Sequence, residues 1–318
     1  MTRVAIAMAV YEPNAEFLRI QLDSIRAQEG VDWTAHVVDD GSSEEGWTRL
    51  LDAVDDDSRF VLHRSPANRG SVAAFGVALG LAAADEPDAI ALSDQDDRWH
   101  PDRLAASAEL LGPEVALVHS DLRMVDGSGT VVAESVWARE HRRPVSGLRG
   151  SILRNVVTGC TVTMRPDVAD LALPIPDHGR DVPYHHDAWL ALQALRLGAV
   201  VGIDRPLVDY RHHGANVVGV SRTGIVDVVR HRRHSMAESF RRAAWSRRVL
   251  AQDLMASVAE HPVDPAEPAR VAREVGVFLG EGGTSDHADL WRAARGSSDM
   301  SRRLGQWYLG RALEAISR

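Results

Sequence analysis

The run Asp94-Gln95-Asp96-Asp97 carries three carboxylates directly after an apolar stretch, residues 89–92. A short apolar stretch of this kind predicts a buried strand, which would place the carboxylates at one end of a sheet. Carboxylate and phosphate oxygens are the ligands that hard divalent cations prefer. The run therefore predicts a site where a cation bridges the protein to a phosphorylated substrate, and a solvated acidic turn is the alternative.

A second predicted strand, residues 34–38, runs into the acidic segment Asp39-Asp40-Gly41-Ser42-Ser43. The strands of an open α/β sheet bind ligands at their carboxyl ends. Two acidic strand ends therefore predict one shared cleft. Ser42 and Ser43 are also candidate caps for a following helix, and both functions are compatible.

Short apolar strands alternate with helical patterns over roughly the first two hundred residues, which predicts an α/β fold with a mostly parallel sheet flanked by helices. Asn14 is a predicted N-cap, Pro101 is predicted in the first turn of a helix, and Gly198 is a predicted helix stop. Strands are predicted over residues 4–10, 34–38, 60–62, 89–92, 115–119, 131–132, 160–164 and 200–203, and helices over 14–28, 46–54, 71–84 and 188–197.

The composition is that of an ordinary globular protein. Its 318 residues are 45% apolar and 25% charged, enough for one large domain or a domain with an appendage. The formal charge of -9 predicts no general attraction to nucleic acid. The single cysteine, Cys160, excludes an internal disulfide and suits a reducing compartment. With no signal peptide or membrane-spanning stretch predicted, we expect a cytoplasmic protein, and contact with the inner face of the plasma membrane stays open.

After about residue 220 the pattern changes to long helical segments, so we predict a catalytic domain over 1–220 and an α-helical region over 221–318. Between Arg230 and Arg248 there are seven arginines and one acidic residue, Glu238. A solvated helix face and a patch for anionic lipid both explain this run. This region also carries apolar residues at helical spacing, which form a stripe suited to docking on the catalytic domain. The stripe comprises Ile225, Val229, Met236, Phe240, Ala244, Leu250, Leu254 and Val258.

Six short motifs follow one another along the chain, the runs at residues 7–11 (AMAVY), 38–43 (VDDGSS), 68–71 (NRGS), 94–97 (DQDD), 186–189 (HDAW) and 210–216 (YRHHGAN). In this order they resemble the family 2 glycosyltransferases of the GT-A fold, and within them the rhamnosyltransferase-like branch. The resemblance covers about residues 3 to 220. One departure is Gly76, where the family often has asparagine.

The resemblance implies metal-dependent inverting transfer from a nucleoside diphosphate sugar, with dTDP- or UDP-linked rhamnose or a related sugar as donor. Asp96 is the first choice as ligand for Mg²⁺ or Mn²⁺, joined by Asp94 and His213. Asp97 is implied as a supporting carboxylate. Asp40 is the implied nucleobase contact. The remaining donor contacts implied are Ala9, Tyr11, Glu12, Asn68, Arg69, Asp94, Gln95 and Arg211.

Asp187 is the implied base that takes the acceptor proton, because inverting transfer needs a base opposite the departing diphosphate. Its alternative role is to cap the helix that follows. The implied acceptor is a saccharide or a polyprenol-linked glycan. The implied acceptor or pocket residues are Gly159, Cys160, His186 and Trp189, and ordinary packing is the competing interpretation for Trp189.

Three other functions remain as alternatives. The pairs His185-His186 and His212-His213 with Asp187 would suit a zinc hydrolase, although adjacent residues on an extended chain point to opposite faces. A sugar nucleotidyltransferase would normally carry a glycine-rich phosphate loop early in the chain, which residues 10–13 do not provide. A catalytically inactive nucleotide-sugar binder is the third.

Overall fold

The computed structural model describes residues 1–142, 147–178, 184–212, 232–281, 287–288, 303–309 and 311–312, with 232–239 described by backbone only. Contacts divide the chain into two units. The sheet unit comprises Met1–Pro144, Val157–Arg180 and His185–Asn216, and the helical unit comprises Val145–Val156, Asp181–Tyr184 and Val217–Arg318. Three short segments of the predicted catalytic domain, residues 145–156, 181–184 and 217–220, thus belong to the helical unit.

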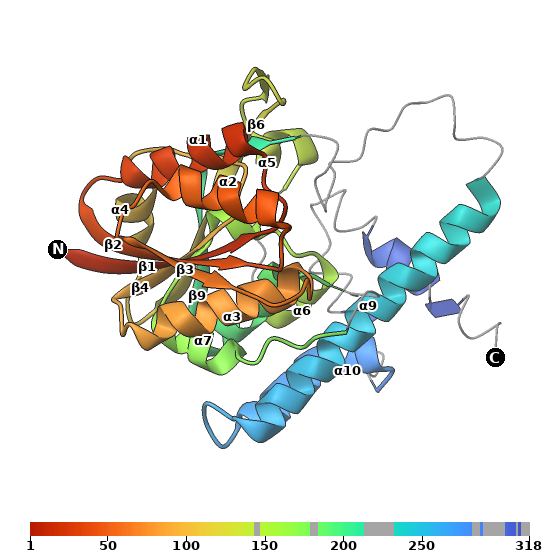
Figure 1. Ribbon diagram of the computed structural model, residues 1–318. Coiled ribbons are helices and arrows are strands. Elements are labelled where there is room, and N and C mark those ends of the chain that lie inside the picture. The colour runs from red at the N-terminus through yellow and green to blue at the C-terminus, as the bar shows by residue number, and fades with distance from the viewer. Residues whose placement is uncertain are drawn as a thin grey trace. The chain divides into compact units, whose positions relative to one another are not determined.

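The sheet unit is built on one mixed, mostly parallel sheet, as predicted (Figure 1). β1 to β4 are mutually parallel, β6 is parallel to β9, and β8 runs antiparallel between β4 and β6. The strand order is β3 (Phe60–Arg64), β2 (Val31–Asp39), β1 (Thr2–Val10), β4 (Ala89–Ser93), β8 (Thr163–Met164), β6 (Val115–Val125), β9 (Ala199–Arg211) and β5 (Arg98–Trp99), and β7 (Val131–Ala133) pairs with β6.

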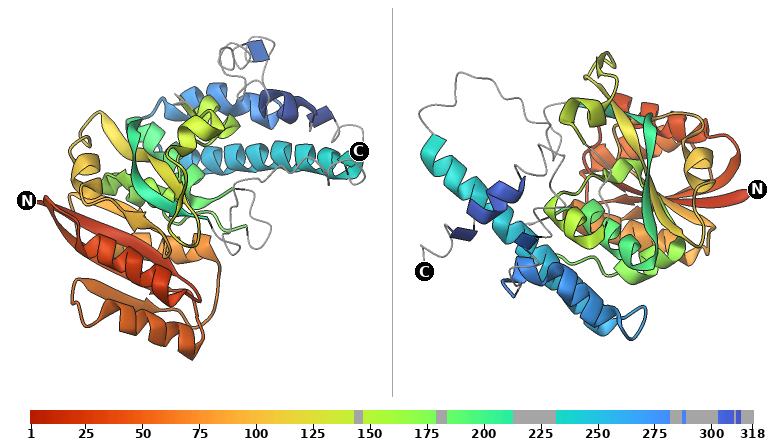
Figure 2. Two further views of the ribbon diagram at one scale, coloured as in Figure 1. Left: turned by 90° about the horizontal axis from the view of Figure 1, so that it is seen from above. Right: turned by 180° about the vertical axis from the view of Figure 1, so that it is seen from behind.

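Helices cover both faces of this sheet. Figure 1 shows α1 and α2 above the strands and α3 and α7 below them, and Figure 2 shows the same arrangement from two further sides. Apolar side chains of both layers meet the strands, and Leu18, Leu22, Leu79 and Ile90 are fully buried. The helices are α1 (Ala15–Arg26), α2 (Glu44–Val54), α3 (Ser71–Ala84), α4 (Arg103–Ala108), α5 (Val136–Glu140), α7 (Pro166–Ala172) and α8 (His186–Leu197).

The helix ends follow their sequence signals. The side chain of Asn14 accepts hydrogen bonds from the amides of Glu16 and Phe17, which confirms it as the N-cap of α1. Ser43 caps α2 by accepting from the Gly46 amide at 3.1 Å. Gly198 follows the last residue of α8, as predicted.

Several boundaries differ from the sequence prediction, and three of them involve residues singled out there. Cys160 lies in a 3-10 turn, Gly159–Thr161, because the Thr158 carbonyl accepts both the amide and the hydroxyl of Thr161, at 3.0 and 2.7 Å. Only Thr163–Met164 is strand. α8 begins at His186, so Asp187 lies in its first turn rather than at its cap. α4 begins at Arg103, so Pro101 precedes the helix.

The strand order reverses between β1 and β4. The chain passes from β1 outward to β2 and β3 and then returns to β4 on the other side of β1. Val10 pairs with Asp39 on one side and Met8 pairs with Ser93 on the other. The carboxyl ends of β1, β2 and β4 therefore lie at one edge of the sheet, where such a reversal typically creates a binding site.

In the helical unit, α6 (Gly147–Leu153), α9 (Arg232–Glu260) and α10 (Glu267–Leu279) carry the described core, and α9 is one long helix (Figure 2). Of the predicted apolar stripe, Ala244, Leu250, Leu254 and Val258 are buried. Ile225 and Val229 lie outside the described residues. No helix in the described ranges is long and apolar enough to cross a membrane.

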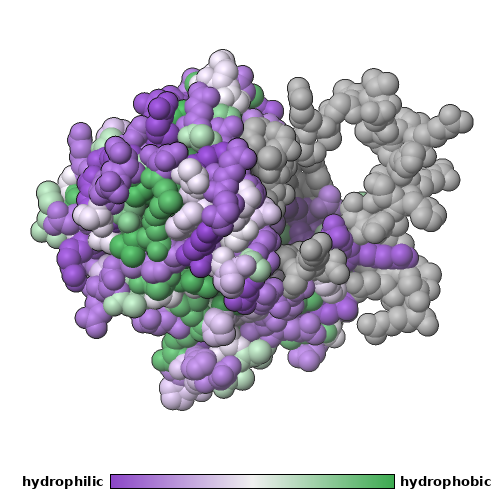
Figure 3. Space-filling model, viewed as in Figure 1, coloured by the Kyte–Doolittle hydropathy of each residue, from purple (hydrophilic) through white to green (hydrophobic). Residues whose placement is uncertain are grey.

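The face of the molecule in Figure 3 is largely hydrophilic, with hydrophobic residues gathered in a smaller area. α2 and α3 each carry an exposed large apolar side chain, Leu51 and Val77, exposed by 44% and 42%. Exposed apolar side chains therefore occur on helices of both layers that cover the sheet.

Candidate active site

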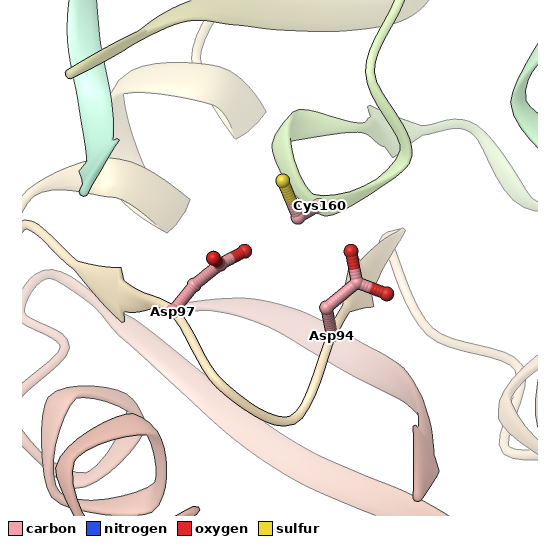
Figure 4. A group of neighbouring side chains, drawn as sticks. All are labelled: Asp94, Asp97 and Cys160. Atoms are coloured by element: carbon pink, nitrogen blue, oxygen red, sulfur yellow. The ribbon is translucent and has the colours of Figure 1, made fainter. Parts of the chain in front are cut away.

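Three carboxylates follow β4 on one loop, as the sequence predicted. Figure 4 shows the Asp94 and Asp97 side chains rising from this loop toward Cys160 on a facing segment. Ligand atoms of these three residues all lie within 4.8 Å of one another. Asp94 and Asp96 are half-buried, whereas Asp97 is fully buried. The loop therefore has an inner carboxylate and two that water can reach.

Asp97 and Cys160 form the inner side of this cluster. Burial, followed by the negative charges of Asp96 and Asp94, raises the pKa of Asp97 well above its usual value. One Asp97 oxygen accepts the amide of Arg211 at 3.1 Å. Burial also raises the pKa of the Cys160 thiol, which bonds to Asp97. A protonated thiol beside a buried carboxyl group is suited to holding the loop, not to nucleophilic attack.

A buried arginine fixes the segment that carries Cys160. Arg103 is fully buried, and its Nη2 donates to the carbonyls of Leu92, Cys160 and Val162 at 3.1, 2.9 and 3.2 Å. Its guanidinium stacks on Trp99 with 3.6 Å between the guanidinium carbon and the ring centroid. Arg103 thereby ties the end of β4 to the turn at 159–161.

Asp94 interacts electrostatically with both Asp96, a predicted metal ligand, and Asp187, the predicted base. Its pKa is raised to about 7, first by burial, then by the charge of Asp96 and then by that of Asp187. The Asp187 carboxylate thus lies close enough to the loop after β4 for its charge to act on Asp94. The structure thus brings Asp94, Asp96 and Asp187 together from chain segments about ninety residues apart.

The Asp187 carboxylate sits in the first turn of α8, where one oxygen accepts the Ala188 amide at 2.6 Å. Burial raises its pKa, and the charge of His185, the Ala188 amide, the charge of Arg142 and a backbone hydrogen bond from Gly159 lower it in that order. These partners hold the carboxylate in place and keep it able to ionise.

His186 is packed against the turn that carries Gly159. Its ring stacks on Phe75 with centroids 4.1 Å apart. A Cβ atom placed on Gly159 would lie 2.7 Å from His186 Nε2, so only glycine fits there. Burial lowers the pKa of His186 to about 3, which keeps the ring neutral. His186 therefore acts as a spacer between the 159–161 turn and the sheet-facing helix α3.

Asp40 lies at the end of β2 and clamps a second loop. Its two oxygens accept the amides of Arg69 and Gly70 at 2.9 and 2.8 Å. Gly41 has a φ of +74°, and a Cβ there would lie 2.5 Å from the Ala67 carbonyl carbon. A glycine is required at 41 because the 67–70 loop presses directly on the turn after β2.

The loop after β1 is held by two side chains predicted to contact the donor. The Gln95 amide accepts from the Tyr11 amide at 2.8 Å and donates to the Tyr11 carbonyl at 3.1 Å. Glu12 accepts the Ser43 amide at 2.7 Å, and its own amide donates to the Ser42 hydroxyl at 2.8 Å. Tyr11 is left 47% exposed at this edge.

The other predicted site residues lie at the ligand edge, in the buried interior or outside the described residues. Ala9, Asn68 and Arg69 lie at the ligand edge, with Asn68 and Arg69 exposed. The Arg211 guanidinium is buried and donates to the carbonyls of Asp96, Asp126 and Gly127. Trp189 is 2% exposed, with its ring nitrogen donating to Ala172 at 2.8 Å, so it packs in the core. His213 lies outside the described residues.

Two residues at the site were not among the predicted site residues. Arg142 donates to Glu140 and to the Thr158 hydroxyl, at 2.7 and 2.9 Å, and its charge acts on Asp187. The hydroxyl of Tyr210 has a raised pKa, caused first by burial and then by the charge of Asp97 and its neighbours. Tyr210 stands in a matched motif, whereas Arg142 stands in none.

The sequence matches the family model for glycosyl transferase family 2 over residues 5–168, just over half of the chain. The chain belongs to this family. It is therefore a glycosyltransferase, which confirms the family and the enzyme class predicted from the motifs. A search among curated proteins finds no match.

Solved glycosyltransferases share the fold. Residues 1–349 of TarS from S. aureus, in complex with UDP-GlcNAc, match with a TM-score of 0.55 and 14% identity over 98% of this chain and 79% of that one. The mannosyltransferase PcManGT from Pyrobaculum calidifontis, in complex with GDP-Man and Mn²⁺, matches with a TM-score of 0.51 and 15% identity over 99% and 86%. These likenesses confirm the predicted GT-A fold.

Proposed function

We propose that this family 2 glycosyltransferase moves a sugar, with inversion, from a nucleoside diphosphate donor to a saccharide or polyprenol-linked acceptor. The observation that carries the proposal is the placement of Asp94 and Asp96 at the ligand edge of the sheet, where the carboxyl ends of β1, β2 and β4 meet and where the charge of Asp187 acts on Asp94. Such a reaction needs a pair of carboxylates at the diphosphate end of the donor. It also needs a separate carboxylate that takes the proton of the acceptor.

In the proposed reaction Asp187 is the general base. The acceptor oxygen attacks the anomeric carbon, its proton passes to an Asp187 oxygen, and the bond from that carbon to the diphosphate breaks. A single displacement of this kind inverts the configuration. Because burial raises the pKa of Asp187, it is a stronger base than an ordinary surface carboxylate. The Gly159 and Ala188 amides orient it.

A divalent cation fits the outer carboxylates. Asp94 and Asp96 repel each other, which is the charge arrangement that a hard cation relieves. Cys160 and Asp97 do not fit as ligands for Mg²⁺ or Mn²⁺, because the thiol is protonated and bonds to the buried Asp97. We therefore assign the ion to Asp94 and Asp96. When bound, it would stabilise charge on the departing diphosphate.

The donor would lie across the end of β1. Asp40 and Asp94 end the strands on either side of β1, which places them two strand spacings apart, about 10 Å. A nucleoside diphosphate can bridge such a separation, with its base near Asp40 and Tyr11. Each Asp40 oxygen keeps a second lone pair that can accept from a uracil or thymine N–H. The rhamnosyltransferase-like motifs favour dTDP-rhamnose.

Residues 1–220 are the proposed catalytic domain and 221–318 a helical region, in a protein working in the cytoplasm or at the inner membrane face. The nucleotidyltransferase alternative is disfavoured, because Tyr11 and Glu12 follow β1 where that class carries a glycine-rich phosphate loop.

A donor panel tests the proposal. The protein is incubated with Mn²⁺ and with dTDP-rhamnose, UDP sugars or GDP-mannose, and both diphosphate release and the melting temperature are measured. We expect at least one dTDP or UDP sugar to raise the melting temperature, and a chelator to abolish the effect. Asp40→Ala should lose the response, while Glu109→Gln, an exposed carboxyl directly after α4, should keep it. If no donor stabilises or is hydrolysed, the proposed function is wrong.

A further inference from the structure

The start of helix α5 is fixed to strand β6 by one buried carboxylate, Asp121. This side chain is 2% exposed, and it accepts hydrogen bonds from the Ser135 hydroxyl and, at 2.9 Å, from the Trp137 amide. On β9, the strand beside β6, a Cβ placed on Gly202 would lie 2.7 Å from Trp137 Cη2, so the indole ring packs directly on that strand. α5 therefore has a fixed place against the sheet.

The other end of α5 fixes the backbone of Arg142. His141 has a φ of +52°, and its amide donates to the Ala138 carbonyl at 3.4 Å. The Arg142 amide donates to the Trp137 carbonyl at 2.8 Å, which completes a Schellman motif. Main-chain bonds to a helix that is itself fixed to the sheet therefore hold the point from which the Arg142 side chain extends.

The Arg142 side chain reaches the turn beside the proposed base. Its Nη1 donates to the Thr158 hydroxyl at 2.9 Å. The Thr158 carbonyl closes the turn at 159–161, and the Gly159 amide bonds to the Asp187 carboxylate. All of these residues belong to the sheet unit. Within one unit, a series of hydrogen bonds thus connects α5 with the segment that holds Asp187.

Two properties of Arg142 suit it to holding the base. Its partly buried guanidinium donates from Nε to Glu140 at 2.7 Å, and this ion pair orients the plane that meets Thr158. Its charge also acts on Asp187. Burial raises the pKa of that carboxyl group, and the charge of Arg142 is among the effects that lower it. Arg142 therefore favours the ionised carboxylate, which is the form that can accept a proton.

We infer that Arg142 is a positioning residue for sugar transfer: anchored by α5, it holds the 158–159 segment that orients Asp187. The inference rests on the proposed function of Asp187 and adds to it a residue that stands in no sequence motif. Arg142 acts on the base through Thr158 and Gly159, not by contact with the reacting atoms. A displacement of about 1 Å at a catalytic group costs on the order of 100-fold in rate, so a looser segment should be detected in kcat.

The test compares variants in the full chain. Thr158→Val removes the hydroxyl that accepts from Arg142, and Thr158→Ser keeps it as the conservative variant. Arg142→Met removes the guanidinium, and Arg205→Met, which removes an exposed arginine of another ion pair, is the matched control. Diphosphate release from the donor that the panel selects, with water as acceptor, gives kcat and KM. The melting temperature is measured, and hydrogen exchange is followed in peptides covering 157–164 and, as a reference, 15–26.

We expect kcat to fall roughly tenfold in Thr158→Val and about 10- to 100-fold in Arg142→Met, with KM for the donor changed by less than about threefold. The melting temperature should fall by only about 2–4 °C, the effect of one hydrogen bond. Thr158→Ser and Arg205→Met should keep the wild-type rate. The variant with both Thr158→Val and Arg142→Met should be no slower than Arg142→Met alone, because both substitutions remove one bond. Exchange should rise over 157–164 only where kcat falls.

The outcomes separate this inference from the function on which it rests. If Arg142→Met and Thr158→Val keep the wild-type rate while Asp187→Asn does not, the positioning role is wrong and the proposed function stands. If Thr158→Ser loses as much rate as Thr158→Val, the hydroxyl bond is not the cause and the inference fails. If kcat and KM change together with global unfolding, Arg142 is only structural and the inference also fails. If Asp187→Asn keeps full activity, the proposed function fails and the inference fails with it.

Discussion

The substitution Gly159→Ala tests the packing around the proposed base. A Cβ at 159 would lie 2.7 Å from His186 Nε2, 3.5 Å from Cε1 and 3.7 Å from Cδ2. The first separation is well below the contact distance of carbon and nitrogen, about 3.5 Å. The added Cβ meets the edge of the His186 ring, and the ring has little room to move because it is buried and Phe75 stacks on it with centroids 4.1 Å apart. The strain must move the 159–161 turn or the start of α8.

The expected cost has two parts. Overpacking of a buried site destabilises by about 1–3 kcal/mol, which would lower the melting temperature by roughly 3–8 °C in a domain of this size. A shift of Asp187 by several tenths of an ångström would lower kcat by on the order of 10- to 100-fold. Donor affinity should change little, because Asp40 follows β2 and the 67–70 loop follows β3, and neither segment belongs to the turn or helix that this substitution strains.

The assay is a double-variant cycle on transfer rate and melting temperature. His186→Ala removes the ring, so Gly159→Ala added to it should cost far less than Gly159→Ala alone. Gly76→Ala, where an added Cβ meets nothing within 4 Å, is the matched control and should behave like the wild type. If Gly159→Ala leaves both quantities unchanged, or if the two substitutions are additive, the packing argument is refuted.

Three further predictions concern stability. Asp209 bonds to His100 and Arg123, and its pKa is lowered from 3.8 to about 2. Its contribution to the free energy of unfolding is therefore complete above pH 3.8 and is lost as the pH falls through 2. Asp209→Asn should remove about 2 kcal/mol of that dependence in pH-series denaturant unfolding, and an unchanged slope would contradict this. His119, buried with a pKa lowered to about 4, is neutral when folded, so stability should fall by about 3 kcal/mol from pH 6.5 to 4, and His119→Gln should flatten this loss in the same titration. Arg211→Lys should lower the free energy of unfolding by roughly 2–3 kcal/mol, because lysine cannot bond to the three carbonyls together, and an equal urea midpoint would count against this.

The parts of the site that lie on strand ends were predictable from sequence. Because Asp94, Asp96 and Asp97 directly follow an apolar strand, their carboxylates lie at the carboxyl edge of the sheet, and the same argument applies to Asp40. The helix caps at Asn14 and Gly198 are local chemistry that residue type largely decides. The order of the six motifs gave the family, which the match over 5–168 confirms.

The parts that depend on contacts between distant segments were not predictable. Gln95 and Glu12 are predicted donor contacts, and the structure adds that both bond to neighbouring loops, because a side chain at a loop can satisfy backbone groups that no periodic pattern reveals. The charge of Arg142 acts on Asp187 only because the folded chain brings the two side chains close together, and no sequence motif indicates this. Cys160 looked like the start of a strand, but hydrogen bonds of Thr161 close a turn there instead.

The most direct test of the central claim is the single-turnover rate of Asp187→Asn, measured beside its donor affinity. The amide keeps the shape of the side chain and cannot accept the acceptor proton. We predict a rate loss of about 100- to 10,000-fold with donor affinity retained, and no loss in Asp170→Asn, an exposed carboxyl on α7. A variant that transfers sugar at a rate near that of the wild type would show that Asp187 is not the base.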